Sequence, residues 1–234
     1  MSHRVAIGAA LGAALLLTAS CGGGVQKPPR ATLGPGVASE SEIRFEDLPV
    51  TRVERSRVPI PNAANPSLGA RDAKVVVQLW SDFECPFCAD AHPALQEMLR
   101  VYAGKVRLVW RDYPLPFHAH ARLAANAGRE AYAQGGAEAF WKFHDAIYGA
   151  PSPHLDADGL ARLADKAGLD QTRFREALST QRHDPEIKRD FDTGNDLGVE
   201  GTPAFLVNDY FFVGAVPFDI LRVIVDRALS DAGA

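Results

Sequence analysis

The run Cys85-Pro86-Phe87-Cys88 constrains the chain most, because it stands between an apolar run and a helical pattern. Residues 75–80, VVVQLW, are typical of a buried strand, and apolar residues recur at helical spacing after Pro93. Two cysteines separated by two residues, at the point where a strand becomes a helix, indicate a redox pair. The unpaired N–H groups and the dipole of a helix start stabilise a thiolate. The sequence therefore predicts a reactive cysteine pair at the beginning of a helix.

Composition limits the classes of partner. The chain has 234 residues, of which 47% are hydrophobic and 23% charged, and this suits one globular domain with an insertion. The formal charge is −4 and no dense basic run occurs. We therefore expect no nucleic acid as a partner.

The first twenty residues are expected to be a signal peptide. Arg4 precedes an unbroken apolar stretch from Val5 to Leu17, which is short for a membrane-spanning helix. The ending LTASC resembles a bacterial lipobox, although Thr18 occupies the place that usually holds leucine. We expect Cys21 to carry a lipid, so that the protein is an exported lipoprotein of the bacterial periplasm or cell envelope. An ordinary cleaved signal with an incidental cysteine is the alternative.

The cysteine count fits this assignment. A third cysteine would be a reactive liability in an exported protein, and lipid attachment to Cys21 removes it. Only Cys85 and Cys88 then remain for disulfide chemistry, which an oxidising compartment allows.

The mature chain is expected to form an α/β domain interrupted by helices. Strand, cysteine-bearing helix and second strand (106–110) favour a parallel pairing. A helical region follows, with a break at Gly135-Gly136, and a hairpin centred on Asn208-Asp209 and a closing helix end the chain. The expected segments are a signal peptide over 1–20, a lipid-anchored flexible tether over 21–57, a first half over 58–117, a helical insertion over 118–197, and a second half over 198–234. Short apolar alternations from Ile43 to Ile60 predict one edge strand.

The spacing of the cysteines favours exchange over stapling, because so small a ring stabilises little. Cys85 should lie at the exposed helix end with the lower pKa and form the mixed disulfide, and Cys88, one turn inward, should resolve it. An inert disulfide and a zinc half-site are the alternatives. Zinc would require two more ligands, and although His92 lies four residues after Cys88, the sequence has no second pair of cysteines. No cofactor is expected beyond the redox-active cysteine pair.

A second motif, Gly201-Thr202-Pro203, precedes the hairpin. Its proline could simply mark the start of a strand. Together with the cysteine motif, however, it resembles the thioredoxin superfamily, and the inserted helices resemble the DsbA-like branch of periplasmic thiol–disulfide oxidoreductases. The likeness covers about residues 58–230 and is carried most specifically by SDFECPFC, FHAHARLAANA, AFWKFHDAIY and GVEGTPAFLVN. It implies a thioredoxin fold with an inserted all-helical subdomain.

The resemblance also implies residue roles and a reaction. Pro203 would follow a cis peptide bond and face the cysteines, Thr202 would border the Cys85 sulfur, and the groups around them would pair with an extended substrate segment. The implied reaction is oxidation of cysteines in other exported proteins, with a membrane quinone-linked partner reoxidising the pair. A reductase or isomerase working from the dithiol, and a non-catalytic binding or redox-sensing lipoprotein, are the alternatives. We expect a monomer.

Two departures from the family pattern concern the strength of the oxidant. Gln78 is aligned with a buried glutamate that shuttles protons to the inner thiol, and an amide cannot do so, which leaves water or Glu84. Between the cysteines, beside Pro86, Phe87 replaces a histidine and offers no charge to the Cys85 thiolate. The sequence therefore predicts a milder oxidant than the histidine-bearing enzymes.

For the other polar and aromatic residues near these motifs, structural roles are favoured over catalytic or metal-binding ones. His118 and His120 do not share a helical face, so capping or packing is favoured over metal binding. His144 is expected to be a hydrogen-bonded structural histidine and Tyr148 a core residue. Asp82 flanks the cysteine motif and is not expected to be catalytic.

Overall fold

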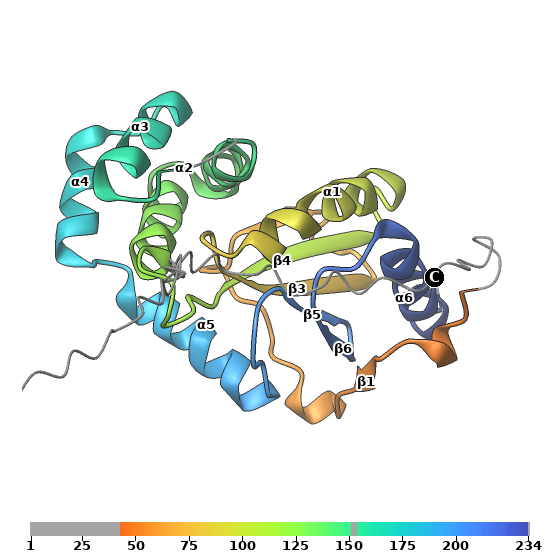
Figure 1. Ribbon diagram of the computed structural model, residues 1–234. Coiled ribbons are helices and arrows are strands. Elements are labelled where there is room, and N and C mark those ends of the chain that lie inside the picture. Colours follow the sequence, from red (N-terminus) through yellow and green to blue (C-terminus); the bar gives the residue numbers. More distant parts are fainter. Residues whose placement is uncertain (1–42, 151–153, 234) are drawn as a thin grey trace, which may run out of the picture. The chain divides into compact units, whose positions relative to one another are not determined.

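The computed structural model describes residues 43–150 and 154–233, which fall in one compact unit (Figure 1). The expected signal peptide, the lipid-attachment residue Cys21 and most of the tether lie outside these residues. Within the described residues, no helix combines the length and the apolar character that crossing a bilayer requires.

Six strands form one mixed sheet in the order β1-β6-β5-β3-β4-β2. The strands β3 and β4 run parallel, as predicted, and every other neighbouring pair is antiparallel. The elements are β1 (Thr51–Arg52), β2 (Ser67–Gly69), β3 (Val75–Ser81), α1 (Pro86–Val101), β4 (Val106–Asp112), α2 (Ala121–Tyr148), α3 (Ala157–Ala167), α4 (Gln171–Thr180), α5 (Asp184–Leu197), β5 (Ala204–Val207), β6 (Tyr210–Val213) and α6 (Phe218–Asp231).

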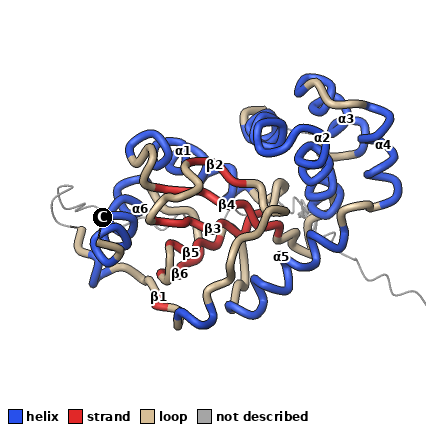
Figure 2. Tube along the Cα trace, turned by 180° about the vertical axis from the view of Figure 1, so that it is seen from behind, coloured by secondary structure: helices blue, strands red, loops and turns tan. Residues whose placement is uncertain are grey.

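Helices cover both faces of the sheet (Figures 1 and 2). Because side chains alternate along a strand, Val77 and Leu79 of β3 enter the larger core with α1 and α6. Trp80 points the other way, into a smaller core with Leu206 and residues of α5. The α/β thioredoxin fold predicted from the sequence is therefore present, and its β3–α1–β4 unit holds the cysteine motif at the end of β3.

The inserted helices show the predicted break and begin with two different arrangements at their first turns. In α2 the backbone leaves helical geometry at Gly135 and Gly136, the latter with φ 64°, where the break was predicted. Asp170 caps α4 by accepting a hydrogen bond from the Arg173 N–H at 2.8 Å. The sequence Asp184-Pro185 predicts a helix capped by Asp184, but Asp184 is the first residue of α5 and its carboxylate binds Arg122 instead.

The structured domain begins earlier than the predicted boundary at residue 58. Phe45 packs edge-on against Tyr210 at 4.9 Å between ring centroids, and β1 pairs with β6 as the expected edge strand. The strand β2 was not predicted, because its three residues contain one apolar side chain, Leu68, within a turn-rich stretch. Residues 43–57 thus belong to the domain and not to a flexible tether.

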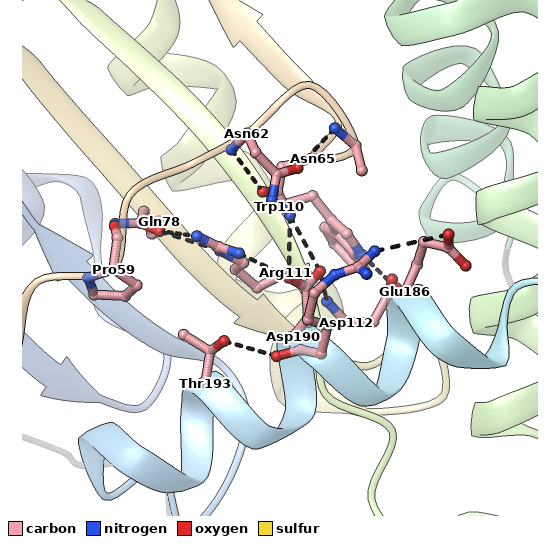
Figure 3. A network of polar contacts seen from close by, with 12 residues as sticks. Pro59, Asn62, Asn65, Gln78, Trp110, Arg111, Asp112, Glu186, Asp190 and Thr193 are labelled. Carbon is pink, nitrogen blue, oxygen red and sulfur yellow. Dashed lines mark hydrogen bonds and ion pairs between the residues drawn. The ribbon is translucent and has the colours of Figure 1, made fainter.

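A buried network of charges joins the inserted helices to the sheet (Figure 3). Arg111 of β4 donates to Asp190 of α5 at 2.8 Å, and Arg129 of α2 pairs with both Asp112 and Asp190. All four side chains are at least 95% buried, and their formal charges cancel. A buried charge is tolerated only when it is paired in this way.

Candidate active site

Both cysteines lie where β3 passes into α1. Cys85 is the N-cap of α1 and Cys88 lies one turn further, with its N–H donating to the Cys85 carbonyl at 3.1 Å. Both are free thiols, and their exposed fractions are 3% and 2%. Cys85 is therefore less exposed than expected, although it is not the deeper of the two. The two residues differ in how a substrate can reach them, because Cys85 lines a cleft and Cys88 does not.

The cleft beside Cys85 has a volume of about 440 Å³. It is formed by the loop before α1, the start of α1, the end of α2 and the segment before α3. The lining residues are Phe83, Glu84, Cys85, Pro86, Ala89, His120, Ile147, Tyr148, Ala150, His154, Leu155 and Asp156. A second hollow of about 370 Å³ lies between residues 58–61 and the end of α6 and contains no cysteine. We therefore assign the active site to the first.

The pKa values of the two thiols are driven apart. The pKa of Cys85 is lowered to about 6, first by a hydrogen bond with the Cys88 thiol and then by Thr202 and the N–H groups of Cys88 and Phe87, while burial opposes the shift. Burial raises the pKa of Cys88 well above its ordinary value. At neutral pH Cys85 is therefore mainly a thiolate and Cys88 a thiol, so Cys85 is ready to attack, whereas Cys88 must lose its proton before it can resolve a mixed disulfide.

The Thr202–Pro203 loop closes over Cys85. The peptide bond between these residues is cis, and the Cys85 thiol donates to the Thr202 carbonyl at 3.3 Å. Within the described part of the chain the buried Thr202 hydroxyl has no hydrogen-bond partner. The structure thus brings the two sequence motifs together, as the family resemblance implies.

Two carboxylates hold the loop that enters α1. Asp82 accepts hydrogen bonds from the N–H groups of Glu84 at 2.8 Å and Leu115 at 2.9 Å, and it contacts His118 Nδ1 at 2.7 Å. Glu84 accepts from the His120 N–H at 2.6 Å. These contacts tie the loop before Cys85 to the entrance of α2. Both histidines therefore have the packing and capping surroundings expected of them.

Gln78 does not lie beneath the cysteine pair, so its predicted place in the site is wrong. Its amide donates to the Pro59 carbonyl at 2.7 Å and accepts from Arg111 at 2.7 Å, on the face of the sheet that α5 covers (Figure 3). The reason is the alternation of side chains along β3, which turns Gln78 away from the α1 face. The other two tuning candidates, Pro86 and Phe87, are exposed and half-buried in the first turn of α1.

Two hydroxyl groups that the sequence patterns did not single out lie beside Cys88. Ser81, the last residue of β3, lies close enough to Cys88 to lower the pKa of that thiol, against the larger effect of burial. The Tyr148 hydroxyl lies 3.3 Å from Ser81 Oγ and 3.2 Å from the Asp82 carbonyl. Tyr148 was assigned to the core from its helical spacing, and it also lines the cleft. The only sequence signal for Ser81 is a polar residue at the end of an apolar strand.

A further group of polar side chains lies between α1 and α2. His144 Nδ1 lies 2.8 Å from the Asp145 carboxylate, and His92 Nε2 lies 3.7 Å from the same oxygen. Their potential ligand atoms all fall within 4.8 Å of one another, and burial lowers the pKa of both histidines. His144 is therefore a buried, hydrogen-bonded histidine. In the part of the chain that the structure describes, no third histidine, cysteine or carboxylate joins Cys85 and Cys88 in such a group.

Comparison with known proteins agrees with this geometry. Residues 62–227 match the sequence profile of a family described as Thioredoxin. The chain belongs to the thioredoxin family. Its fold is shared with a thioredoxin-like oxidoreductase from Silicibacter pomeroyi DSS-3, at a TM-score of 0.65 and 31% identity, over 72% of this chain and 94% of the other. The thioredoxin fold with a helical insertion is thereby confirmed.

Two curated relatives bear different names. The probable disulfide bond formation protein D of Bacillus anthracis is 28% identical over 70% of this chain and 78% of its own length. A protein of Salinispora tropica named Na(+)/H(+) antiporter NhaA 3 is 38% identical over 75% of this chain but only 26% of its own length. The chain thus spans about a quarter of the length of the antiporter relatives that it matches.

The resemblance to DsbA-like thiol–disulfide oxidoreductases is confirmed at the level of the family.

Proposed function

We propose that this thioredoxin-family protein is an exported thiol–disulfide oxidoreductase that forms disulfides in other exported proteins. The observation that carries the proposal is the opposite shift of the two thiol pKa values within one active site. A lowered pKa beside a cleft provides the exchanging sulfur, and a raised pKa in the interior provides the resolving one. The redox-active pair Cys85–Cys88 serves in place of a bound cofactor.

In the oxidising direction a substrate thiolate attacks Cys85 Sγ in the disulfide. The Cys85–Cys88 bond breaks, its electron pair goes to Cys88, and a mixed disulfide forms between substrate and Cys85. A second substrate thiolate then attacks the substrate sulfur and releases Cys85 as a thiolate. Two electrons pass from substrate to enzyme. The lowered pKa of Cys85 makes it the better leaving group in this second step.

The direction of the reaction rests on the stability of the reduced form. At pH 7 a thiol pKa of about 6 stabilises the reduced form by about 1.4 kcal/mol relative to an ordinary thiol. For a two-electron couple this makes the disulfide about 30 mV more oxidising. The pKa lies between about 7 for thioredoxin and about 3.5 for DsbA. This intermediate pKa supports an oxidase milder than the histidine-bearing enzymes. It agrees with the uncharged Phe87 at the position of their histidine.

The substrate would dock along the Thr202–Pro203 loop and into the cleft. The backbone of that loop lies beside the Cys85 sulfur and can pair with an extended segment. Phe117 is 75% exposed and follows the loop that Asp82 holds near the site, where it offers an apolar contact. The expected partners are therefore unfolded or extended cysteine-containing chains.

Location and attachment belong to the same proposal. The predicted signal peptide and lipidated Cys21 would place the domain at the outer face of a bacterial membrane, where a membrane redox partner reoxidises the pair. The domain would act as a monomer. Support comes from relatives named for disulfide bond formation and from the longer antiporter-named relatives, in which a matching segment is about a quarter of the protein. Labelling with radioactive palmitate, lost in Cys21→Ala, tests the anchor.

One set of assays tests the reaction. The disulfide form should oxidise a reduced, unfolded protein, and Cys85→Ser should abolish the reaction. Cys88→Ser cannot form the enzyme disulfide and should also lose this reaction. Mixed with a substrate that already contains a disulfide, its Cys85 thiolate should instead trap a mixed disulfide, because no Cys88 thiol is present to resolve it. The equilibrium potential against glutathione then fixes the direction. A value near that of thioredoxin, about −270 mV, would favour the reductase or isomerase. Substrate binding without exchange would favour the binding lipoprotein.

A further inference from the structure

We propose that His92, His144 and Asp145 form a binding site for one divalent transition-metal ion such as Zn²⁺. His92 belongs to α1, the helix of the two cysteines, and the other two residues belong to α2, the first helix of the insertion. A bound ion would therefore cross-link these two helices. The site takes no part in the thiol–disulfide exchange proposed above and does not rest on it.

The three side chains bring their nitrogen and oxygen atoms close together. His144 Nδ1 lies 2.8 Å from Asp145 Oδ1, and His92 Nε2 lies 3.7 Å from the same oxygen. One ligand atom from each residue can be chosen so that all three lie within 4.8 Å of one another. Ligands held tetrahedrally at about 2.0–2.2 Å from zinc are about 3.3–3.6 Å apart. A change of side-chain torsions would thus bring all three atoms around one ion.

The chemistry of the three ligands selects the class of ion. Two imidazoles and one carboxylate are a set that holds zinc, with a water molecule in the fourth position. Calcium and magnesium prefer a sphere made of oxygen atoms, so two nitrogen ligands disfavour them. Among the residues that the structure describes, no other three histidine, cysteine or acidic side chains approach one another this closely.

Aromatic rings hold the His144 imidazole in place. The ring centroids of Trp141 and Tyr148 both lie 4.8 Å from that of His144, and the centroid of Trp110 lies 5.3 Å away. The His144 side chain is only 3% exposed. A ligand whose orientation is already fixed by packing loses little conformational freedom when it binds. His144 is therefore a preorganised ligand.

The other two ligands make the group accessible to an ion. The side chain of Asp145 is 54% exposed and that of His92 is 17% exposed. The carboxylate at the surface also supplies the negative charge that attracts a cation. His92 lies one turn after Cys88 on α1, and Tyr148, which packs on His144, lines the active-site cleft. The bound ion would thus brace the two helices beside the active site.

The test is calorimetric titration of the protein with Zn²⁺. The disulfide form is used, because joining Cys85 to Cys88 prevents these thiols from binding the metal. His92→Gln and Asp145→Ala should each weaken binding by more than about a hundredfold, since losing even a group that only hydrogen-bonds to a metal ligand costs about 10–100-fold. His154→Gln is the matched control, because it removes an exposed histidine outside the group and should bind Zn²⁺ as the wild type does.

Thermal unfolding gives a second readout and shows that the variants are folded. Zn²⁺ should raise the unfolding temperature of the wild type and of His154→Gln, because an ion bound only by the folded state stabilises it. It should not do so for His92→Gln or Asp145→Ala, and Ca²⁺ at the same concentration should have no effect. Equal Zn²⁺ affinity in the wild type and both ligand variants, absence of Zn²⁺ binding, or an equal shift with Ca²⁺ would overturn the proposal.

Discussion

The Cys85 thiol donates a hydrogen bond to the carbonyl oxygen of Thr202, 3.3 Å away and 117 residues later in the chain. That carbonyl accepts only from the neutral thiol and has nothing to offer the thiolate. The buried Thr202 hydroxyl, which has no partner within the described residues, is the group that can turn to donate to the charged sulfur. Thr202 thus contacts the neutral Cys85 thiol through its carbonyl oxygen and can contact the Cys85 thiolate through its hydroxyl group.

Thr202→Val tests this division. The variant keeps the shape of the side chain and removes the hydroxyl, so the pKa of Cys85 should rise by about one unit, the effect of one hydrogen bond to a charged group. Titration of the thiolate absorbance measures the pKa, and Thr202→Ser should retain the wild-type value. An unchanged pKa in Thr202→Val would show that the hydroxyl does not stabilise the thiolate.

The pH dependence of Cys85 reactivity follows from its lowered pKa. Alkylation by iodoacetamide should increase as the pH rises, with a midpoint near pH 6, because only the thiolate reacts. Cys88→Ala removes the hydrogen bond that contributes most to the shift and should move the midpoint upward. Equal midpoints in the two proteins would contradict the role of the Cys88 thiol.

Phe87→His should lower the pKa of Cys85 further, because an imidazolium next to a thiolate stabilises it. A lower pKa stabilises the reduced form, so the potential against glutathione should become more oxidising, by about 30 mV for each further tenfold stabilisation. Phe87→Leu keeps an uncharged side chain and should leave both quantities near wild type. A potential that does not change in Phe87→His would show that the charge of this side chain does not act on Cys85.

Removal of Arg129 should destabilise the protein strongly. Arg129→Met leaves Asp112 and Asp190 buried without one of their cations, and breaking a buried pair costs about 3–5 kcal/mol. Denaturant unfolding gives the free energy. Arg100→Met is the control, since the Arg100–Glu97 pair is exposed and should cost no more than about 1 kcal/mol. Similar losses in both variants would contradict the structural role of the network.

Gly194 lies where α5 packs tightly against Trp80 of β3 and Tyr113. A Cβ atom there would lie 2.8 Å from both Trp80 Cδ1 and Tyr113 Cε2, so Gly194→Ala should destabilise by about 1–3 kcal/mol despite the better helix propensity of alanine. Thermal unfolding measures the effect. Gly201→Ala, where nothing lies within 4 Å of the added carbon, should have little effect on stability.

The parts of the fold predicted correctly have local causes. The break in α2 follows from two adjacent glycines, and the turn between β5 and β6 from Asn208, which has φ 52°. The parallel pairing of β3 and β4 follows from the strand–helix–strand order. These features need no knowledge of distant parts of the chain. The strand β2 has no comparable signal and forms only because β4 offers a free edge.

The outline of the active site could be predicted because its motifs are short stretches of sequence. The surroundings of the site could not be predicted, because they come from several elements. The error at Gln78 is one of strand phase, since a shift of one residue moves a side chain to the other face of a sheet. Leu79, its neighbour, is the residue that enters the core on the α1 side. The burial of Cys85 and the position of Tyr148 in the cleft depend on segments that lie far apart in the sequence. No local sequence pattern predicts either feature.

The paired charges on β4, α2 and α5 have a consequence for how the molecule opens. If the inserted helices swung away from the sheet, Arg111 and Asp112 would be left without the carboxylate and guanidinium that neutralise them. Partial opening therefore gives up all the ion pairs of this network at once, and we expect the insertion and the thioredoxin core to melt in a single transition. Backbone amides near Asp190 should then exchange with deuterium as slowly as those in the centre of β3. We thus expect the insertion, although it interrupts the chain of the domain, to unfold as part of the same cooperative unit.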